Sequence, residues 1–104
     1  MLDRYRIIIL PRASADIAEA HAYIERDSPQ NATAVVRRLI QTIDSLELLP
    51  HRFKVYRASR NAARVVRSVP VPPHILYYRV VERDKVVLIL TIRHGARRQP
   101  RSFD

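Results

Sequence analysis

The chain has 104 residues, of which 47% are hydrophobic, and this length suits one compact domain over residues 1–104 and is too short for two. It contains no cysteine and one glycine, Gly95, which excludes disulfides, thiolate metal sites and the glycine-rich phosphate loops of nucleotide-dependent enzymes. The formal net charge of +9 is unevenly placed: residues 51–104 carry eleven Arg and two Lys against three acidic residues, whereas residues 1–50 carry six Arg against seven.

The first half of the chain predicts one strand and two helices. Residues 5–10 form a short apolar run rich in isoleucine that stops at Pro11, which indicates a buried strand. Apolar residues then recur at helical spacing, so we expect amphipathic helices over residues 11–27 and 31–48. The short break between them, at residues 28–31, makes the pair an antiparallel hairpin. The stripes that should pack together are formed by Ile17 and Ile24, and by Val36, Leu39 and Ile43.

The second half predicts a loop and three strands. Residues 51–63 have no clean period and several basic residues, so we expect a mobile basic loop. Strand patterns follow at residues 64–69, 75–81 and 86–92, and the polar link between the last two has the length of a hairpin turn. The predicted fold class is α+β, with the order β-α-α-β-β-β and a helical hairpin packed on one face of a mainly antiparallel sheet.

The last of these strands is apolar on both faces, which is typical of a central strand. By alternation, Thr91 shares one face with Val87 and Ile89, and the other face carries Val86, Leu88, Leu90 and Ile92. The helices can cover only one face. We therefore expect residues 95–104 or a partner chain to cover the other.

Alternation also orients the side chains of the two preceding strands. Tyr77 and Arg79 should share one face, while Arg64 and Arg67 should lie on opposite faces. The tyrosines expected in the core, each with a polar tip, are Tyr5, Tyr23 and Tyr78.

The basic second half predicts an anionic partner, such as nucleic acid, an acidic protein segment or a membrane surface. Seventeen of the 19 basic residues are Arg, whose guanidinium group suits bidentate contacts to phosphate and carboxylate. A merely solvated surface is the alternative. The run Arg57, Arg60, Arg64 and Arg67 has no acidic residue among its members, which favours a binding surface.

Membrane, metal and cofactor partners are not expected. Charges at Asp3, Arg4 and Arg6 interrupt the N-terminal apolar residues, which fits neither a signal peptide nor a membrane span, so we expect a cytoplasmic protein. The histidines have no metal-like spacing with Asp or Glu, and no cofactor motif occurs.

Several short motifs stand in a characteristic order along the chain. They are residues 5–10, Ala13-x-x-Asp16-Ile17, Tyr23-Ile24, Pro29-x-x-Ala32, Ile43-x-x-Leu46-x-x-x-Pro50, residues 75–80, and residues 86–92 with the basic exit at residues 93–98. In this order the motifs resemble the RelE/ParE superfamily of bacterial type II toxins, and they look closest to the ParE-like branch.

The resemblance implies a growth-inhibiting toxin in a hetero-oligomer with a cognate antitoxin, whose acidic or amphipathic C-terminal segment wraps the toxin. Members of the ParE-like branch inhibit DNA gyrase, whereas members of the RelE-like branch cleave messenger RNA on the ribosome. This chain departs from the second pattern, because its loop carries only Lys54 where paired lysines are typical, and Phe103 replaces a tail tyrosine.

These departures favour a non-enzymatic gyrase inhibitor over a ribosome-dependent endonuclease, which stays the alternative. A second alternative is a non-toxic, small basic nucleic-acid-binding module. That class normally interleaves stacking aromatic residues with its arginines, and the basic half offers few outside the predicted core.

Three sets of candidate site residues follow from the resemblance and from the charge pattern. The antitoxin-binding set is Arg67, Tyr77, Arg79 and Thr91. The target-binding set is Arg57, Arg60, Arg93, Arg97 and Arg98. For an endonuclease, the catalytic set is His94 as acid or base, with Arg64, Arg67, Arg79 and Arg98 as phosphate clamps.

Overall fold

The computed structural model describes residues 2–103, which form a five-stranded mixed sheet and two helices. The elements are β1 (Arg6–Ile9), α1 (Pro11–Glu25), α2 (Pro29–Ser45), β2 (Lys54–Arg57), β3 (Val66–Val71), β4 (His74–Val81) and β5 (Val86–His94). The strand order is β1-β5-β4-β3-β2, with β1 parallel to β5 and the other neighbours antiparallel. The predicted α+β class and the central place of the last strand are confirmed.

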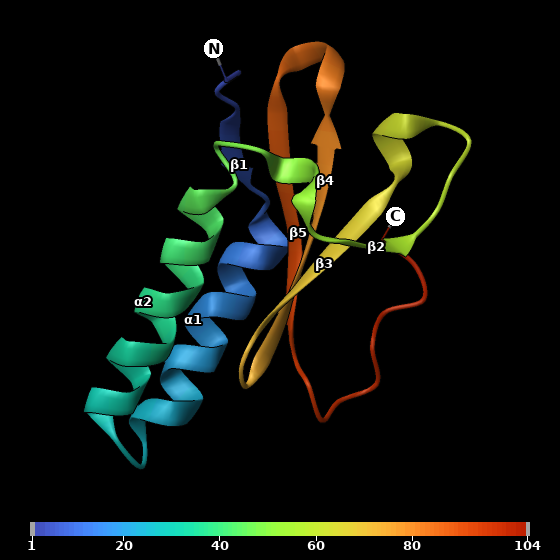
Figure 1. Cartoon of the computed structure of the whole chain (residues 1–104). Coiled ribbons are helices and arrows are strands. Elements are labelled where there is room, and N and C mark those ends of the chain that lie inside the picture. Colours follow the sequence, from blue (N-terminus) through green and yellow to red (C-terminus); the bar gives the residue numbers. More distant parts are fainter. Residues whose placement is uncertain (1, 104) are drawn as a thin grey trace.

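The two helices form the predicted hairpin and lie on one side of the sheet (Figure 1). α2 begins two residues earlier than the period indicated, at Pro29. The Ser28 side chain accepts a hydrogen bond from the backbone N–H of Asn31 at 3.2 Å. Pro29 has no backbone N–H, so it adds no donor without an acceptor to the first turn of the helix. Among the described residues, neither helix is long and apolar enough to cross a membrane.

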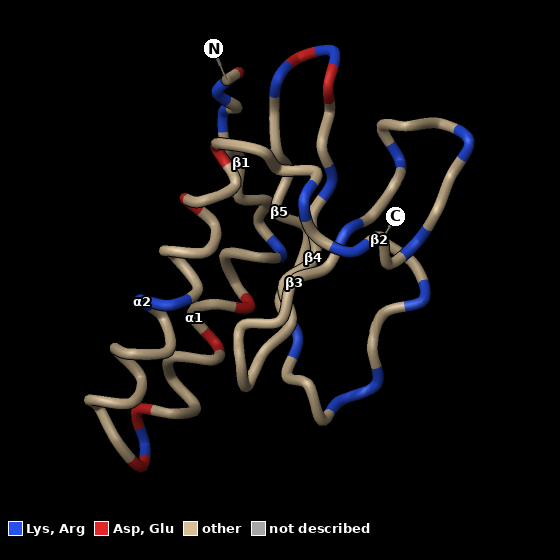
Figure 2. The backbone as a smooth tube through the Cα atoms, in the orientation of Figure 1, with Lys and Arg blue, Asp and Glu red and all other residues tan. Residues whose placement is uncertain are grey.

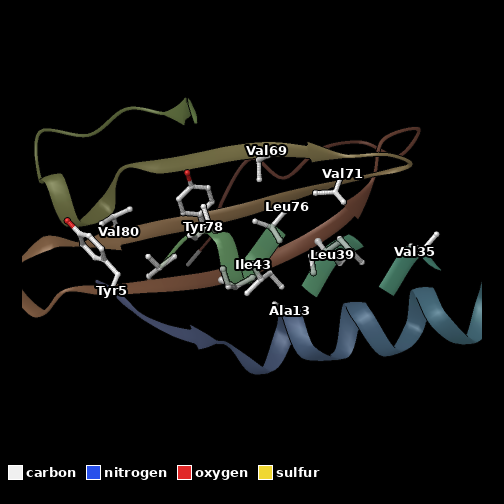
Figure 3. Close-up of a cluster of buried hydrophobic side chains, with 14 residues drawn as sticks. Tyr5, Ala13, Val35, Leu39, Ile43, Val69, Val71, Leu76, Tyr78 and Val80 are labelled. Atoms are coloured by element: carbon white, nitrogen blue, oxygen red, sulfur yellow. The ribbon is translucent and has the colours of Figure 1, made fainter. Parts of the chain in front are cut away.

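The main core lies between the hairpin and the sheet (Figure 3). Leu39 and Ile43 of α2 are fully covered, and they pack against Leu76 of β4 and Ile89 of β5 in one cluster. Ile17 and Ile24 of α1 pack against its edge. The helical stripes therefore face the sheet as predicted, except at Val36. Val36 is only half-buried, and Val35, one turn before Leu39, takes its place in the core.

The predicted mobile loop over residues 51–63 is wrong in part, because it contains β2 at the edge of the sheet. Two side chains hold the segment that leads into β2. Arg67 donates to the carbonyls of His51 and Phe53 at 2.9 and 2.8 Å, and the hydroxyl of Tyr78 donates to the carbonyl of Pro50 at 2.7 Å. Burial raises the pKa of Tyr78 to about 12, so this hydroxyl keeps its proton.

Strict alternation in the last strand is also wrong, because β5 carries a bulge. Tyr77 pairs with Thr91 and Tyr78 with Ile89, which leaves Leu90 as the extra residue. Ile92 therefore joins Val87 and Ile89 on the helix-facing side of the sheet. A sequence pattern of period two has no signal for this shift.

Two predictions about single side chains are wrong as well. Tyr23 is 69% exposed on α1, because its position lies outside the stripe that faces the sheet. Arg64 lies in a short 3₁₀ turn, Ala62–Arg64, before β3 begins, so its relation to Arg67 is not one of strand alternation.

Candidate binding surfaces

The C-terminal tail, residues 95–103, covers the sheet face that the helices leave open (Figure 1). A second apolar cluster forms there around Val66, Tyr77 and Leu90, and Phe103 packs against it. The ring of Phe103 lies 5.3 Å from the ring of Tyr77 and 6.0 Å from that of Tyr56. Of the two predicted covers for this face, the structure places the tail on it.

Hydrogen bonds fix the tail to β4 and β2. The Tyr77 hydroxyl donates to the side-chain oxygen of Gln99 at 2.6 Å, and the Tyr56 hydroxyl donates to the carbonyl of Pro100 at 2.8 Å. Arg57 donates to the carbonyl of Arg101. Burial and the neighbouring Tyr56 raise the pKa of Tyr77 to about 12. Tyr77 is therefore a neutral, fully covered anchor for the tail.

A groove of about 760 Å³ lies between α1 and the ends of β4 and β5. The exposed ring of Tyr23 and the side chains of Arg12, Arg26 and Arg97 line it. Asp16 lies in its wall, with both carboxylate oxygens engaged by Arg12, Thr91 and the backbone of β5. The exposed Glu19 also lines the groove, which thus offers an aromatic ring beside arginines, one carboxylate that is already paired and one that is exposed.

The predicted antitoxin-binding residues do not form one exposed patch. Thr91 and Tyr77 are 5% and 1% exposed, and their hydroxyls are bound within the chain. Arg67 faces the helix side of the sheet and holds the carbonyls before β2, whereas Arg79 shares the opposite face with Tyr77.

The predicted catalytic set is not brought together either. Arg67 is separated from Arg79 by the sheet, and Arg98 lies in the tail. His94 ends β5 with its Nδ1 accepting the backbone N–H of Ala96 at 3.0 Å, so a neutral ring carries its proton on Nε2. The nitrogen that a general base would use is occupied by this contact.

The predicted target-binding arginines lie on exposed parts of the chain, apart from the half-buried Arg93. The loop between β2 and β3 and the tail carry Lys or Arg and no described Asp or Glu (Figure 2). Arg60, Arg97 and Arg98 form no ion pair or side-chain hydrogen bond with any residue of the described range 2–103. Their charges are uncompensated.

Sequence reasoning missed Tyr23 as a surface residue and Gln99 as the partner of Tyr77. The helical period around Tyr23 does carry a signal, because the position falls off the Ala13–Ile17–Ile24 stripe. Gln99 has no signal in the sequence, since its partner lies 22 residues away. Within residues 2–103, no three side chains gather that could hold a metal ion.

Comparisons with known proteins agree on one family. The family model for the ParE toxin of the type II toxin–antitoxin system parDE matches residues 7–99. Toxin RelE2 of Caulobacter vibrioides is 38% identical over 87 residues, which cover 83% of this chain and 90% of that protein.

Two solved structures share the fold. A chain of the chromosomal ParDE toxin–antitoxin system from P. aeruginosa superposes with a TM-score of 0.67 at 20% identity, over 88% of this chain and 97% of that one. A chain of the archaeal RelE–RelB complex from Pyrococcus horikoshii gives 0.67 at 21% identity, over 91% and 99%. With the match over residues 7–99, these findings confirm the resemblance, and the chain belongs to the ParE family of type II toxin–antitoxin toxins within the RelE/ParE superfamily.

Proposed function

We propose that this toxin inhibits growth by acting on DNA gyrase, without RNA cleavage, and is neutralised by a cognate antitoxin. The observation that carries the choice of target is that the candidate proton-transfer and phosphate-binding groups are dispersed within residues 2–103. Cleavage of RNA through its 2′-hydroxyl needs a base, a proton donor and cations that converge on one phosphate. His94, Arg67 and Arg79 do not converge on such a point.

The position of the tail supports the same choice. Phe103 brings no hydroxyl, and its ring packs between Tyr56 and Tyr77. Both tyrosine hydroxyls already donate to tail atoms, and Tyr77 titrates only at about 12. Tyr77 is therefore not poised to give or take a proton near neutral pH.

Uncompensated arginines support binding rather than chemistry as the toxic act. Arg97 and Arg98 follow β5 directly, and Arg60 lies in the loop after β2. Guanidinium groups on exposed segments can contact an acidic enzyme surface or its bound DNA through charge-assisted hydrogen bonds. Removal of these arginines one after another should then weaken inhibition stepwise.

The antitoxin is expected to place its acidic or amphipathic segment in the groove beside α1. The two solved relatives described above are a ParDE system and a RelE–RelB complex. Here the tail already occupies the second sheet face, whereas the groove presents Tyr23 beside Arg12, Arg26 and Arg97. An apolar ring flanked by cations fits a segment that alternates apolar and acidic residues.

The test of the target compares His94→Ala with Arg97→Ala/Arg98→Ala in a growth assay. Purified protein is assayed in parallel for inhibition of gyrase supercoiling and of cell-free translation. We expect His94→Ala to inhibit growth like the parent, the double Arg variant to lose inhibition, and supercoiling to be the step that stops. A general acid or base contributes about 10²–10⁴-fold, so intact supercoiling, blocked translation and an inactive His94→Ala would establish the endonuclease instead.

The antitoxin is tested by co-purification with the product of the adjacent gene. Tyr23→Ala should weaken the complex, and Tyr56→Ala, which changes the tail side, should not. A complex that survives Tyr23→Ala and is lost with Tyr56→Ala would move the antitoxin to the tail side of the sheet.

A further inference from the structure

β2 and the C-terminal tail lie side by side, although 44 residues separate the positions that are in contact. Tyr56 donates to the carbonyl of Pro100 at 2.8 Å, and Arg57 donates to the carbonyl of Arg101. These contacts place the tail beside β2, from which the loop with Arg60 and Arg64 continues, so that the arginines of the loop and the tail lie on the same side of the molecule (Figure 2). We define this basic surface by Arg57, Arg60, Arg64, Arg97, Arg98 and Arg101, all of which are exposed.

Three arginines of the basic surface have no acidic partner among the described residues. The described acidic residues lie before β1, on the helices and their connections, and in the turn Glu82–Asp84 between β4 and β5 (Figure 2). Three of the six guanidinium groups, those of Arg60, Arg97 and Arg98, have no ion pair or hydrogen bond within residues 2–103. An external anion can compensate these charges.

We propose that the basic surface binds the phosphate backbone of duplex DNA directly, in the absence of gyrase and of antitoxin. An array of phosphates needs only guanidinium groups spread over a surface, because each contact is an ion pair with two parallel hydrogen bonds. The proposal goes beyond the proposed function, since it assigns to this chain a ligand that it holds by itself.

The aromatic residues near the basic surface argue for a duplex rather than a single strand. Proteins that bind single strands stack bases on exposed rings. Here Phe103 and Tyr77 pack inward, and Tyr56, although 38% exposed, is held edge-on against Tyr77 and by its hydrogen bond to Pro100. The ring of Tyr23, which is 69% exposed, lines the groove beside α1.

The composition of the segments that form the basic surface argues against an acidic peptide as its ligand. A disordered segment that folds on its target must bury apolar area to offset the entropy that it loses. The chain between β2 and β3 offers Ala, Ser, Asn and Arg apart from the half-buried Val65, and Pro100 of the tail is buried. The groove beside α1 provides an apolar ring, and the basic surface provides charge.

The experiment measures binding of the full chain to a fluorescent duplex of about 20 base pairs by anisotropy, from about 50 to about 200 mM salt. The variant Arg60→Gln/Arg97→Gln/Arg98→Gln removes three charges from the basic surface. The control Arg6→Gln/Arg37→Gln/Arg83→Gln removes three charges from exposed positions on β1, α2 and the β4–β5 turn, where no guanidinium group is paired within residues 2–103. Thermal melts establish that both variants fold.

For the parent, the logarithm of affinity should fall with the logarithm of salt with a slope of about −0.9 per phosphate contact. The surface variant should make this slope shallower by up to about 3 and weaken binding by about tenfold or more, while the control keeps the parental slope. Equal losses in the two variants would overturn the proposal, because net charge alone would then explain binding. Tighter binding to single-stranded DNA or to polyglutamate would also overturn it.

Gyrase is absent from this assay, so its outcome is separate from that of the proposed function. Salt-dependent duplex binding by a protein that leaves supercoiling intact would support the DNA surface and refute the gyrase target. Inhibition of supercoiling by a protein that does not bind the duplex would do the reverse.

Discussion

Asp16 on α1 and Thr91 on β5 are joined by a hydrogen bond of 2.5 Å across 75 residues of sequence. The same carboxylate oxygen accepts the backbone N–H of Ile92 at 3.0 Å, just after the bulge at Leu90. Arg12, one turn earlier on α1, lies 3.4 Å from the other oxygen. One side chain thus fixes the first helix to the central strand where the ladder is irregular.

Replacement of Asp16 by Ala should lower the free energy of unfolding by about 1–3 kcal/mol, because it leaves the Thr91 hydroxyl and the Ile92 amide without their acceptor. Urea denaturation measures the loss. Glu19→Ala is the control, since Glu19 is exposed on the same helix and its change should stay within about 0.5 kcal/mol. Equal midpoints for the two variants would contradict the role of this contact.

Leu39 is a second point where the helical layer depends on one side chain. It is fully covered in the main core, so Leu39→Ala should cost about 2–5 kcal/mol through lost burial and the cavity that remains. The neighbouring Ile40 is 36% exposed, and Ile40→Ala should cost less than about 1 kcal/mol. Thermal melts of both variants decide the register of α2, and a larger loss for Ile40→Ala would show it to be wrong.

Replacement of Phe103 tests whether its ring anchors the tail to the sheet. Phe103→Ala removes two aromatic contacts and should destabilise the protein by about 1–2 kcal/mol, because such pairs contribute about 0.5–1.5 kcal/mol beyond the area that they bury. It should also speed tryptic cleavage after Arg98 and Arg101. Cleavage after Arg83, in the distant β4–β5 turn, gives the internal reference. Unchanged tail cleavage relative to this reference would mean that Phe103 does not hold the tail.

The parts of the fold that local patterns encode were predictable. The stripe of Leu39 and Ile43 has a helical period, and the apolar run after Lys85 has a strand period, so the helices and the central strand were expected correctly. β2 was missed because its four residues are exposed and contain only short apolar stretches. Its strand state depends on pairing with β3, which no local pattern reports.

The candidate site was less predictable, because the use of each polar side chain depends on tertiary neighbours. Arg67 looked like one more member of a basic cluster, yet it holds two carbonyls of the segment before β2. Tyr77 looked like a contact residue beside Arg79, yet the tail buries it. The charge imbalance between the two halves of the chain, by contrast, is predictable, because it depends only on the order of residues in the sequence.

His74 should make stability depend on pH. It is 7% exposed at the start of β4, its ring lies 5.5 Å from that of His94, and its Nδ1 has no hydrogen-bond partner within residues 2–103. Burial, together with the neighbouring charges of His94 and Arg38, lowers the pKa of His74 below its usual value of 6.5. The folded protein therefore resists protonation of this ring.

The direction of the effect follows from proton counting. Well above about pH 6.5, the His74 ring is neutral in both the folded and the unfolded state, so it does not make the free energy of unfolding depend on pH. As the pH falls below 6.5, the unfolded chain takes up the proton first, so the free energy of unfolding decreases until the folded pKa is passed. His74→Gln should remove this part of the acid destabilisation, whatever its effect on stability at neutral pH.

Urea midpoints measured between about pH 8 and pH 5 for parent and variant isolate this contribution, because the carboxylates are common to both. Arg38→Gln should reduce the acid destabilisation in part, since it removes a positive charge that opposes protonation of His74, and Arg37→Gln, on the exposed face of α2, should leave it unchanged. Parallel pH profiles for the parent and His74→Gln would show that this ring is protonated as readily in the folded protein as in the unfolded chain.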